Sequence, residues 1–157
     1  MLGVLPSYTQ LGMAALLPHK ELSYEKESDE VFADGKSTKG TENRSKILQA
    51  IIPNSIAITS DDLLAIPNGK TWIKEYDVIY IYSNTIDKVG DSLATEKNVF
   101  KATEDELDKL TRLVKWIRDA NGYNILITSD HGYIYQNETL DETDFTDFKA
   151  LGETCFI

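Results

Sequence analysis

The chain has 157 residues, a length that fits one domain with one hydrophobic core. Its formal net charge of -10 argues against direct binding of nucleic acid, because phosphate backbones are held mainly by Lys and Arg. An anionic substrate would need local positive charge, which bound metal ions can supply. We expect a soluble cytoplasmic protein, since Cys155 has no partner for an internal disulfide and neither a signal peptide nor a membrane span is apparent.

Near the start of the chain, Thr9 stands just before an apolar run, Leu11–Leu17, that Pro18 ends. The run predicts a helix that is buried on all sides. Two interpretations of Thr9 are open. It caps the helix, which is the commoner role of a Thr there, or it displays its hydroxyl as a nucleophile at the positive end of the helix dipole.

Residues 21–36 alternate and predict a small surface β-hairpin with arms at 22–25 and 30–33. A polar loop over 36–41 follows, and Thr41 is expected to cap a helix over 42–51. Lys36, Lys39 and Arg44 form a local basic group in an acidic chain. They are candidate contacts for an anionic substrate, and a solvated loop is the alternative.

The middle of the chain predicts a strand at 56–59, a helical turn at 61–65 capped by Ser60, and an apolar strand at 77–82. Asp87 and Asp91 follow that strand four residues apart. On a helical turn they would share one face and could hold one cation. The alternative is two solvated acids in a loop.

A capping box at Thr103 and Glu106 opens a predicted helix over 104–120. Its apolar stripe comprises Leu107, Leu110, Leu113, Val114 and Ile117. The helix leads into a predicted strand at 124–128. A crossover of this kind makes the two strands parallel, so we expect an α/β fold with a mostly parallel sheet sandwiched by helices, and both acid-bearing loops at one edge of the sheet.

Asp130, His131 and Gly132 follow the second strand, at the end where ligands bind in open α/β sheets. Carboxylate and imidazole are natural ligands for a divalent metal such as zinc, and Gly132 would allow a sharp turn beside them. The alternative is a surface turn in which Asp130 caps local amides and His131 is exposed.

Three motifs carry a resemblance to a known family. They are the segment 6–18 with Thr9, the strand 78–82 with the segment 86–91, and the segment 128–133 with Asp130 and His131. In this order they resemble the PglZ domain, a branch of the alkaline phosphatase superfamily associated with BREX phage-defence systems. They span nearly the whole chain.

The resemblance implies an alkaline-phosphatase-like core that hydrolyses phosphate or sulfate esters with two divalent metal ions. Zinc is expected, with manganese or magnesium as alternatives. Thr9 would be the nucleophile and form a covalent intermediate. Asp130 and His131 would bind one metal, and Asp87 and Asp91 the other. The expected partners are other subunits of the defence system and a phosphate-ester substrate, with no membrane.

Two departures from the superfamily pattern stand out. Only eight residues precede Thr9 where relatives have another metal-binding Asp, and no His follows His131. We therefore expect residues 1–157 to be a single partial domain that is weakly active or inactive alone, with its metals missing. One alternative is a non-catalytic assembly module that keeps the fold. Another is a sulfatase or phosphomutase, although no Cys near Thr9 offers the usual sulfatase nucleophile.

Overall fold

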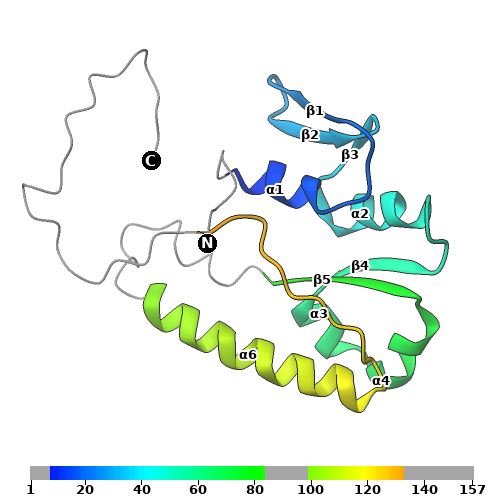
Figure 1. Cartoon of the computed structure of the whole chain (residues 1–157), viewed down its shortest axis with the longest axis vertical. Helices are drawn as coiled ribbons and strands as arrows, with labels where there is room; N and C mark the ends of the chain where they lie inside the picture. Colours follow the sequence, from blue (N-terminus) through cyan, green and yellow to red (C-terminus); the bar gives the residue numbers. More distant parts are fainter. Residues whose placement is uncertain (1–7, 84–98, 133–157) are drawn as a thin grey trace, which may run out of the picture.

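The computed structural model describes residues 8–83 and 99–132. This part of the chain contains both helices and strands, as predicted for an α/β protein (Figure 1). In chain order the elements are α1 (Thr9–Ala15), β1 (Leu22–Glu25), β2 (Glu30–Ala33), β3 (Lys36–Ser37), α2 (Gly40–Gln49), β4 (Ser55–Thr59), α3 (Ser60–Ala65), α4 (Gly69–Trp72), the 3-10 turn η1 (Ile73–Glu75), β5 (Val78–Tyr82) and α6 (Val99–Asp119).

The centre of the fold is a parallel pair, β4 and β5, in register from Ser55 opposite Val78 to Thr59 opposite Tyr82. Side chains alternate across it. Ala57 and Tyr80 belong to a cluster on one face, and Ile58 and Ile81 pack into a second cluster on the other. Such alternation places apolar groups on both faces of a sheet that helices cover on both sides.

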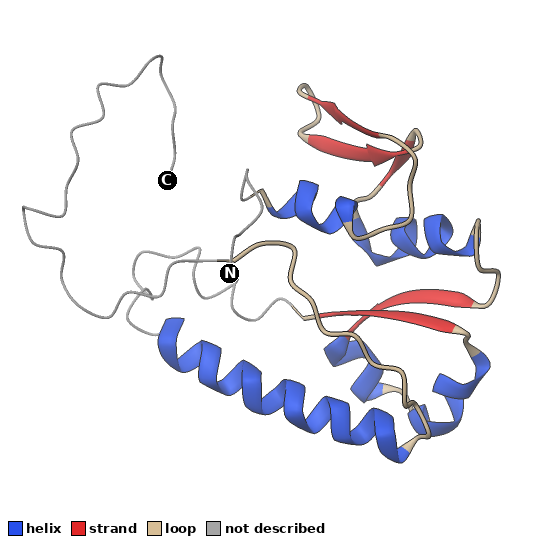
Figure 2. Ribbon diagram, viewed as in Figure 1, coloured by secondary structure: helices blue, strands red, loops and turns tan. Residues whose placement is uncertain are grey.

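The first cluster joins the sheet to α2 and the hairpin, and the second joins it to α3, α4 and α6, so the pair lies between helices (Figure 2). The buried members are Leu17, Ala33, Ile47, Leu48 and Ala57 in the first cluster and Leu63, Leu113 and Ile117 in the second. The parallel sheet is confirmed. The parallel sheet has two strands within the described ranges. The predicted larger parallel sheet sandwiched by helices is therefore not confirmed.

The predicted hairpin is present, with β1 and β2 antiparallel and in register from Leu22 opposite Ala33. The expectation of a loop directly after it was wrong, because Lys36–Ser37 adds a third strand, β3, to β2. Asp34 and Gly35 connect β2 and β3 with φ values of 49° and 74°. A two-residue loop with both φ angles positive is the hairpin turn that Asp-Gly favours, because its twist matches that of the strands.

Several helix boundaries differ from the predictions. α2 begins at Gly40, so Thr41 does not cap it, and Thr59 rather than Ser60 caps α3. α6 begins at Val99, and Thr103 therefore lies inside the helix. The Lys-Ala-Thr stretch before Glu104 holds no helix breaker, which lets the helix extend toward its N-terminus.

The burial of the helices also corrects the predictions. α1 is not buried on all sides, because Ala14 is buried while Ala15 is exposed. On α6, Leu113 and Ile117 are buried, but Leu107 of the predicted stripe is 59% exposed. Among the described helices, none combines the length and the apolar character needed to cross a membrane.

The predicted strand at 124–128 is not formed. This segment has no assigned strand structure, and Leu126 and Ile127 are 90% and 61% exposed, although Ile125 packs into the second cluster. A strand requires a neighbour to satisfy its backbone groups, and no described strand pairs with this one. The segment runs from the end of α6 back toward α1 (orange in Figure 1), and this path still delivers residues 130 and 131 to the Thr9 helix.

Candidate active site

Three of the predicted site residues meet in the structure. Thr9 is the first residue of α1, and His131 lies 122 residues later in the chain, yet Thr9 Oγ1 is 3.0 Å from His131 Nε2. The same nitrogen lies 3.5 Å from Asp130 Oδ2. A hydroxyl, an imidazole nitrogen and a carboxylate oxygen therefore converge at the N-terminal end of α1.

The interpretation of Thr9 as a helix cap is wrong. Tyr8 occupies the N-cap position of α1, and no side-chain capping bond is formed there. Instead, the Thr9 hydroxyl is within hydrogen-bonding distance of His131 in a partly buried setting. A hydroxyl that is free of the helix backbone is available to a reaction partner.

The surface-turn interpretation of Asp130 and His131 is also wrong. The side chains of His131 and Asp130 are only 19% and 14% exposed. Asp130 Oδ2 is buried and has no hydrogen-bond partner among the described residues. Leaving a carboxylate oxygen buried and unpaired costs free energy. A hydrogen-bond donor or a cation bound to this oxygen would remove that cost.

The arrangement is not that of a Ser-His-Asp triad, in which the acid and the nucleophile contact different ring nitrogens. Here both face Nε2 of His131, while Nδ1 lies 3.3 Å from the Gly132 carbonyl oxygen. With the proton on Nδ1, Nε2 presents its lone pair to Thr9. Metal-ligating His residues commonly donate their other N–H to a backbone carbonyl in this way.

The donor set fits a divalent metal such as zinc, which accepts nitrogen and oxygen ligands. At this end of α1, the unpaired Asp130 oxygen and the lone pair of His131 Nε2 are two atoms that a cation would satisfy. In the described ranges no group of three or more His, Cys, Asp or Glu side chains could hold a metal. Asp87 and Asp91, the other predicted ligands, lie outside the described residues.

The three predicted basic residues occupy different environments. Lys36 and Lys39 are exposed, whereas Arg44 is only 8% exposed. Arg44 Nε donates to the Thr38 carbonyl oxygen at 2.8 Å, and its guanidinium lies 4.6 Å from the centre of the Tyr82 ring. No carboxylate forms an ion pair with Arg44 within the part of the chain described here.

Arg44 also connects to the Thr9 helix and to the end of β5. Its Nη1 is 3.9 Å from the sulfur of Met13, one helical turn after Thr9. Tyr82 is the last residue of β5, and its hydroxyl is buried without a partner among the described residues. Burial raises the pKa of Tyr82, and the nearby Arg44 charge opposes that rise. Arg44 is thus a buried cation between α1 and the carboxyl end of the sheet.

A buried polar cluster that was not predicted from the sequence lies at the carboxyl ends of both parallel strands. Ser83, directly after β5, donates to Glu106 Oε1, and Ser60, directly after β4, lies 3.3 Å from the Ser83 hydroxyl. Glu106 is 4% exposed and its Oε2 has no partner among the described residues. Glu106 precedes Leu110, Leu113 and Ile117 at helical spacing, which is the signal that placed it on the buried face.

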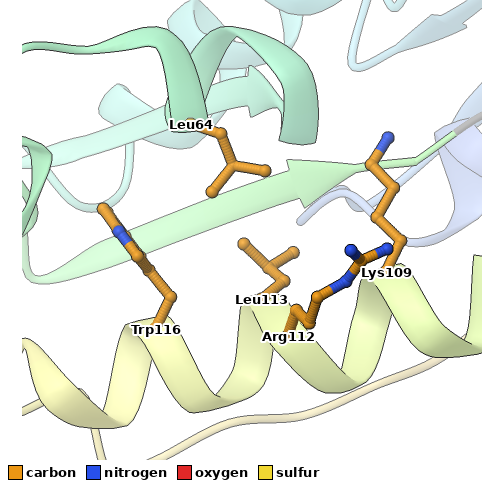
Figure 3. A pocket seen from close by; sticks show the side chains of 5 residues that line it. All are labelled: Leu64, Lys109, Arg112, Leu113 and Trp116. Atoms are coloured by element: carbon orange, nitrogen blue, oxygen red, sulfur yellow. The ribbon is translucent and has the colours of Figure 1, made fainter.

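A surface groove of the described structure lies elsewhere. It has a volume of about 390 Å³ and runs between α3 and α6, where Leu64, Lys109, Arg112, Leu113 and Trp116 line it (Figure 3). Lys109 Nζ is also 2.6 Å from Asp61 Oδ1. None of the predicted site residues lines this groove, so it does not belong to the site at Thr9.

Comparison with known proteins adds the family context. The model of the BREX system PglZ alkaline phosphatase-like domain matches residues 1–157. The alkaline phosphatase-like protein BrxZ of Escherichia coli O9:H4 (strain HS) is 47% identical over 156 residues, which are 97% of this chain and 18% of that protein. The alkaline phosphatase-like protein PglZ of Bacillus cereus (strain H3081.97) is 43% identical over 148 residues, or 92% of this chain and 17% of that protein. No solved structure matches significantly. The chain thus spans less than a fifth of the length of these relatives.

Proposed function

The chain belongs to the PglZ family of BREX-associated, alkaline phosphatase-like domains, and from this membership we propose that it carries the nucleophile of a metal-dependent phosphatase or phosphodiesterase. The observation that supports the proposal most is the 3.0 Å contact between Thr9 Oγ1 and His131 Nε2. The family motifs containing these two residues are 122 positions apart in sequence, and the fold brings them together.

In the proposed reaction, Thr9 Oγ attacks the phosphorus of the ester in line with the leaving oxygen. The new O–P bond forms as the P–O bond to the alcohol breaks, and the alcohol leaves with a proton. Attack of water on the phosphothreonine then releases phosphate and restores the Thr9 hydroxyl. With its proton on Nδ1, His131 orients the Thr9 hydroxyl by accepting a hydrogen bond from it at Nε2.

Asp130 and His131 would hold one divalent ion, and Asp87 and Asp91 a second. Zinc is proposed, with manganese or magnesium as alternatives. When bound, such ions supply positive charge that favours the alkoxide of Thr9 and the leaving oxygen. The relatives extend far beyond this segment, so we propose that further ligands come from the rest of the parent protein and that residues 1–157 alone are weakly active or inactive.

Arg44 is the best placed of the three proposed substrate contacts. Its buried charge has no carboxylate partner in the described ranges, and it touches Met13 of the Thr9 helix. A guanidinium can bind phosphate oxygens through paired N–H donors. Lys36 and Lys39 are exposed, and as proposed contacts they would act at longer range. We further propose that the parent acts in the cytoplasm with other subunits of a BREX system.

The test uses the full-length parent protein with p-nitrophenyl phosphate and bis(p-nitrophenyl) phosphate. Thr9→Ala should lower kcat by roughly 10³-fold or more, the scale seen when a nucleophile is removed, while Thr9→Ser should keep part of the activity. Thr111→Ala is the matched control, because Thr111 is exposed in the middle of α6. Turnover that is equal in Thr9→Ala and in the parent would contradict the proposal.

A non-catalytic assembly module is the second candidate function. The observation that favours it is the exposed apolar pair Leu126 and Ile127, at 90% and 61% exposure, since clustered exposed apolar groups commonly mark contact surfaces. Phage plating on cells with a complete BREX system separates the two functions. A Thr9→Ala parent that still protects cells, together with loss of protection in Leu126→Ser, would favour the module over the hydrolase.

A further inference from the structure

Gly12 is a point of close approach between α1 and the segment that carries Asp130 and His131. A Cβ atom built on Gly12 would lie 2.7 Å from the Asp130 carbonyl oxygen, 2.9 Å from its Cβ and 3.0 Å from its carbonyl carbon. Separations under 3.0 Å essentially never occur for real Cβ atoms. The absent side chain is therefore what lets the two segments pack together.

Gly12 lies on the same side of α1 as Thr9. Residues three apart on a helix share a face, and the backbone N–H of Gly12 donates to the Tyr8 carbonyl oxygen at 2.9 Å in regular helical geometry. One turn of α1 thus makes two contacts with residues 130 and 131. The Thr9 hydroxyl reaches His131, and the bare Gly12 backbone reaches Asp130.

Any side chain at position 12 would separate these contacts. The gap to the Asp130 oxygen would have to widen from 2.7 Å to at least 3.0 Å, and to 3.4 Å to reach ordinary van der Waals contact. The clashing atoms include backbone, which cannot rotate aside. A shift to ordinary contact that moves residues 130 and 131 away from α1 would take the Thr9–His131 pair from 3.0 Å beyond ordinary hydrogen-bonding distance.

We propose that Gly12 is a positioning residue that sets the distance between the Thr9 hydroxyl and the Asp130–His131 pair. The inference rests on the proposed function for its catalytic consequence, but its geometric content stands apart from it. Gly in a helix interior is less stable than Ala, and the Asp130 contact gives the physical reason for Gly at this position.

The first experiment measures geometry rather than activity. Carbethoxylation of histidine by diethyl pyrocarbonate is followed by peptide mass spectrometry in the metal-free full-length protein. His131 should react several-fold faster in the Gly12→Ala variant than in the unsubstituted protein, because its Nε2 no longer contacts the Thr9 hydroxyl. The exposed His19 is the reference in the same molecule and should not change.

Gly132→Ala is the matched control. Gly132 neighbours His131, but a Cβ built there meets no atom of the described residues within 4 Å, so the rate at His131 should stay as in the unsubstituted protein. Thr9→Ala should raise that rate as Gly12→Ala does, and the double variant should show no further increase. Additive effects of the two changes would overturn the positioning role, because residues that act through one contact are not additive.

Steady-state kinetics supplies the second experiment. If the parent hydrolyses phosphate esters, Gly12→Ala should lower kcat by about 100-fold, since misplacement by about 1 Å can have that effect, with little change in KM. If the unsubstituted full-length protein is active and Gly12→Ala leaves its kcat unchanged, the inference is overturned. A parent without Thr9-dependent activity but with the expected His131 rates contradicts only the proposed function. Loss of the native circular dichroism spectrum in Gly12→Ala would assign Gly12 to packing and also overturn the inference.

Discussion

Tyr8 and Tyr24 both donate their hydroxyls to Asp29 Oδ1, each at 2.8 Å. Hydrogen bonds from Tyr24 and then Tyr8 lower the pKa of Asp29, and the bond to Asp29 is the main cause that raises the pKa of Tyr8 to about 12. Through these two hydrogen bonds, Tyr8, the residue before Thr9, is bound to the turn between β1 and β2. The sequence offered no signal for it, because 21 residues separate Tyr8 from Asp29.

The signs of the two shifts give the pH dependence. The lowered pKa of Asp29 stabilises the fold above the unfolded value, near 3.9, and this contribution is lost as pH falls through the folded pKa. The raised pKa of Tyr8 stabilises the fold below pH about 10, and this contribution is lost as pH rises through about 12.

We expect Asp29→Asn to return the pKa of Tyr8 toward about 10, as measured by NMR titration of its ring. An unchanged midpoint would contradict the contact. Asn is the suitable replacement because residue 29 has a φ of 52°, which Asn tolerates.

A second prediction at this scale concerns Arg44. Replacing Arg44 by Lys removes the planar set of donors but keeps the charge, so inhibition of ester hydrolysis by inorganic phosphate should weaken about tenfold, the effect of losing roughly 1.4 kcal/mol. Lys36→Ala and Lys39→Ala are the controls and should change the inhibition constant about twofold or less, because exposed charges are screened by solvent. Equal effects in all three variants would contradict the special role of Arg44.

Single residues also show how far sequence reasoning reaches. Thr9, Asp130 and His131 carry distinctive chemistry within motifs, and the structure brings their side chains together. Gly12 could not, because its importance depends on a backbone contact with residue 130. Glu106 was misread as a capping residue, since its carboxylate instead accepts the Ser83 hydroxyl at the end of β5.

Among the elements, α3 is capped by the side chain of Thr59, which was not predicted from the sequence. Thr59 Oγ1 accepts from the Asp62 backbone N–H at 3.1 Å and donates to Asp62 Oδ2 at 2.6 Å. Thr59→Ala should lower the free energy of unfolding by about 1 kcal/mol, measured by urea denaturation. Thr111→Ala on α6 is the control and should stay within about 0.5 kcal/mol of the parent, because its hydroxyl bonds only to the Leu107 carbonyl oxygen at an exposed position. A smaller loss in Thr59→Ala than in the control would refute the cap.

Elements with a local cause were predicted well. The hairpin and α6 follow from alternation and helical spacing, and both are present. The 124–128 segment failed because an apolar run specifies burial but not a partner. Ile125 is packed into the second cluster, yet Leu126 is 90% exposed. A strand exists only where a neighbouring backbone accepts its hydrogen bonds, and that information is absent from the segment itself.

For the whole molecule, the two apolar clusters on either side of β4 and β5 hold the described part together. They join the hairpin and α2 on one face to α3, α4 and α6 on the other, and α1 is attached to the first cluster through Leu17. The α/β class was predictable from the alternation of apolar runs. The extent of the sheet was not, because the chain corresponds to 18% and 17% of the two relatives.

In the proposed reaction, Thr9 forms a covalent bond to the phosphorus of an ester substrate. The most direct test mixes the metal-loaded full-length protein with p-nitrophenyl phosphate, quenches it in acid, and maps the bound phosphate by peptide mass spectrometry. We predict a phosphothreonine at Thr9 that is absent from Thr9→Ala and from protein quenched before substrate is added. Ester turnover by the parent without phosphate on Thr9, or with phosphate on another residue, would contradict the account.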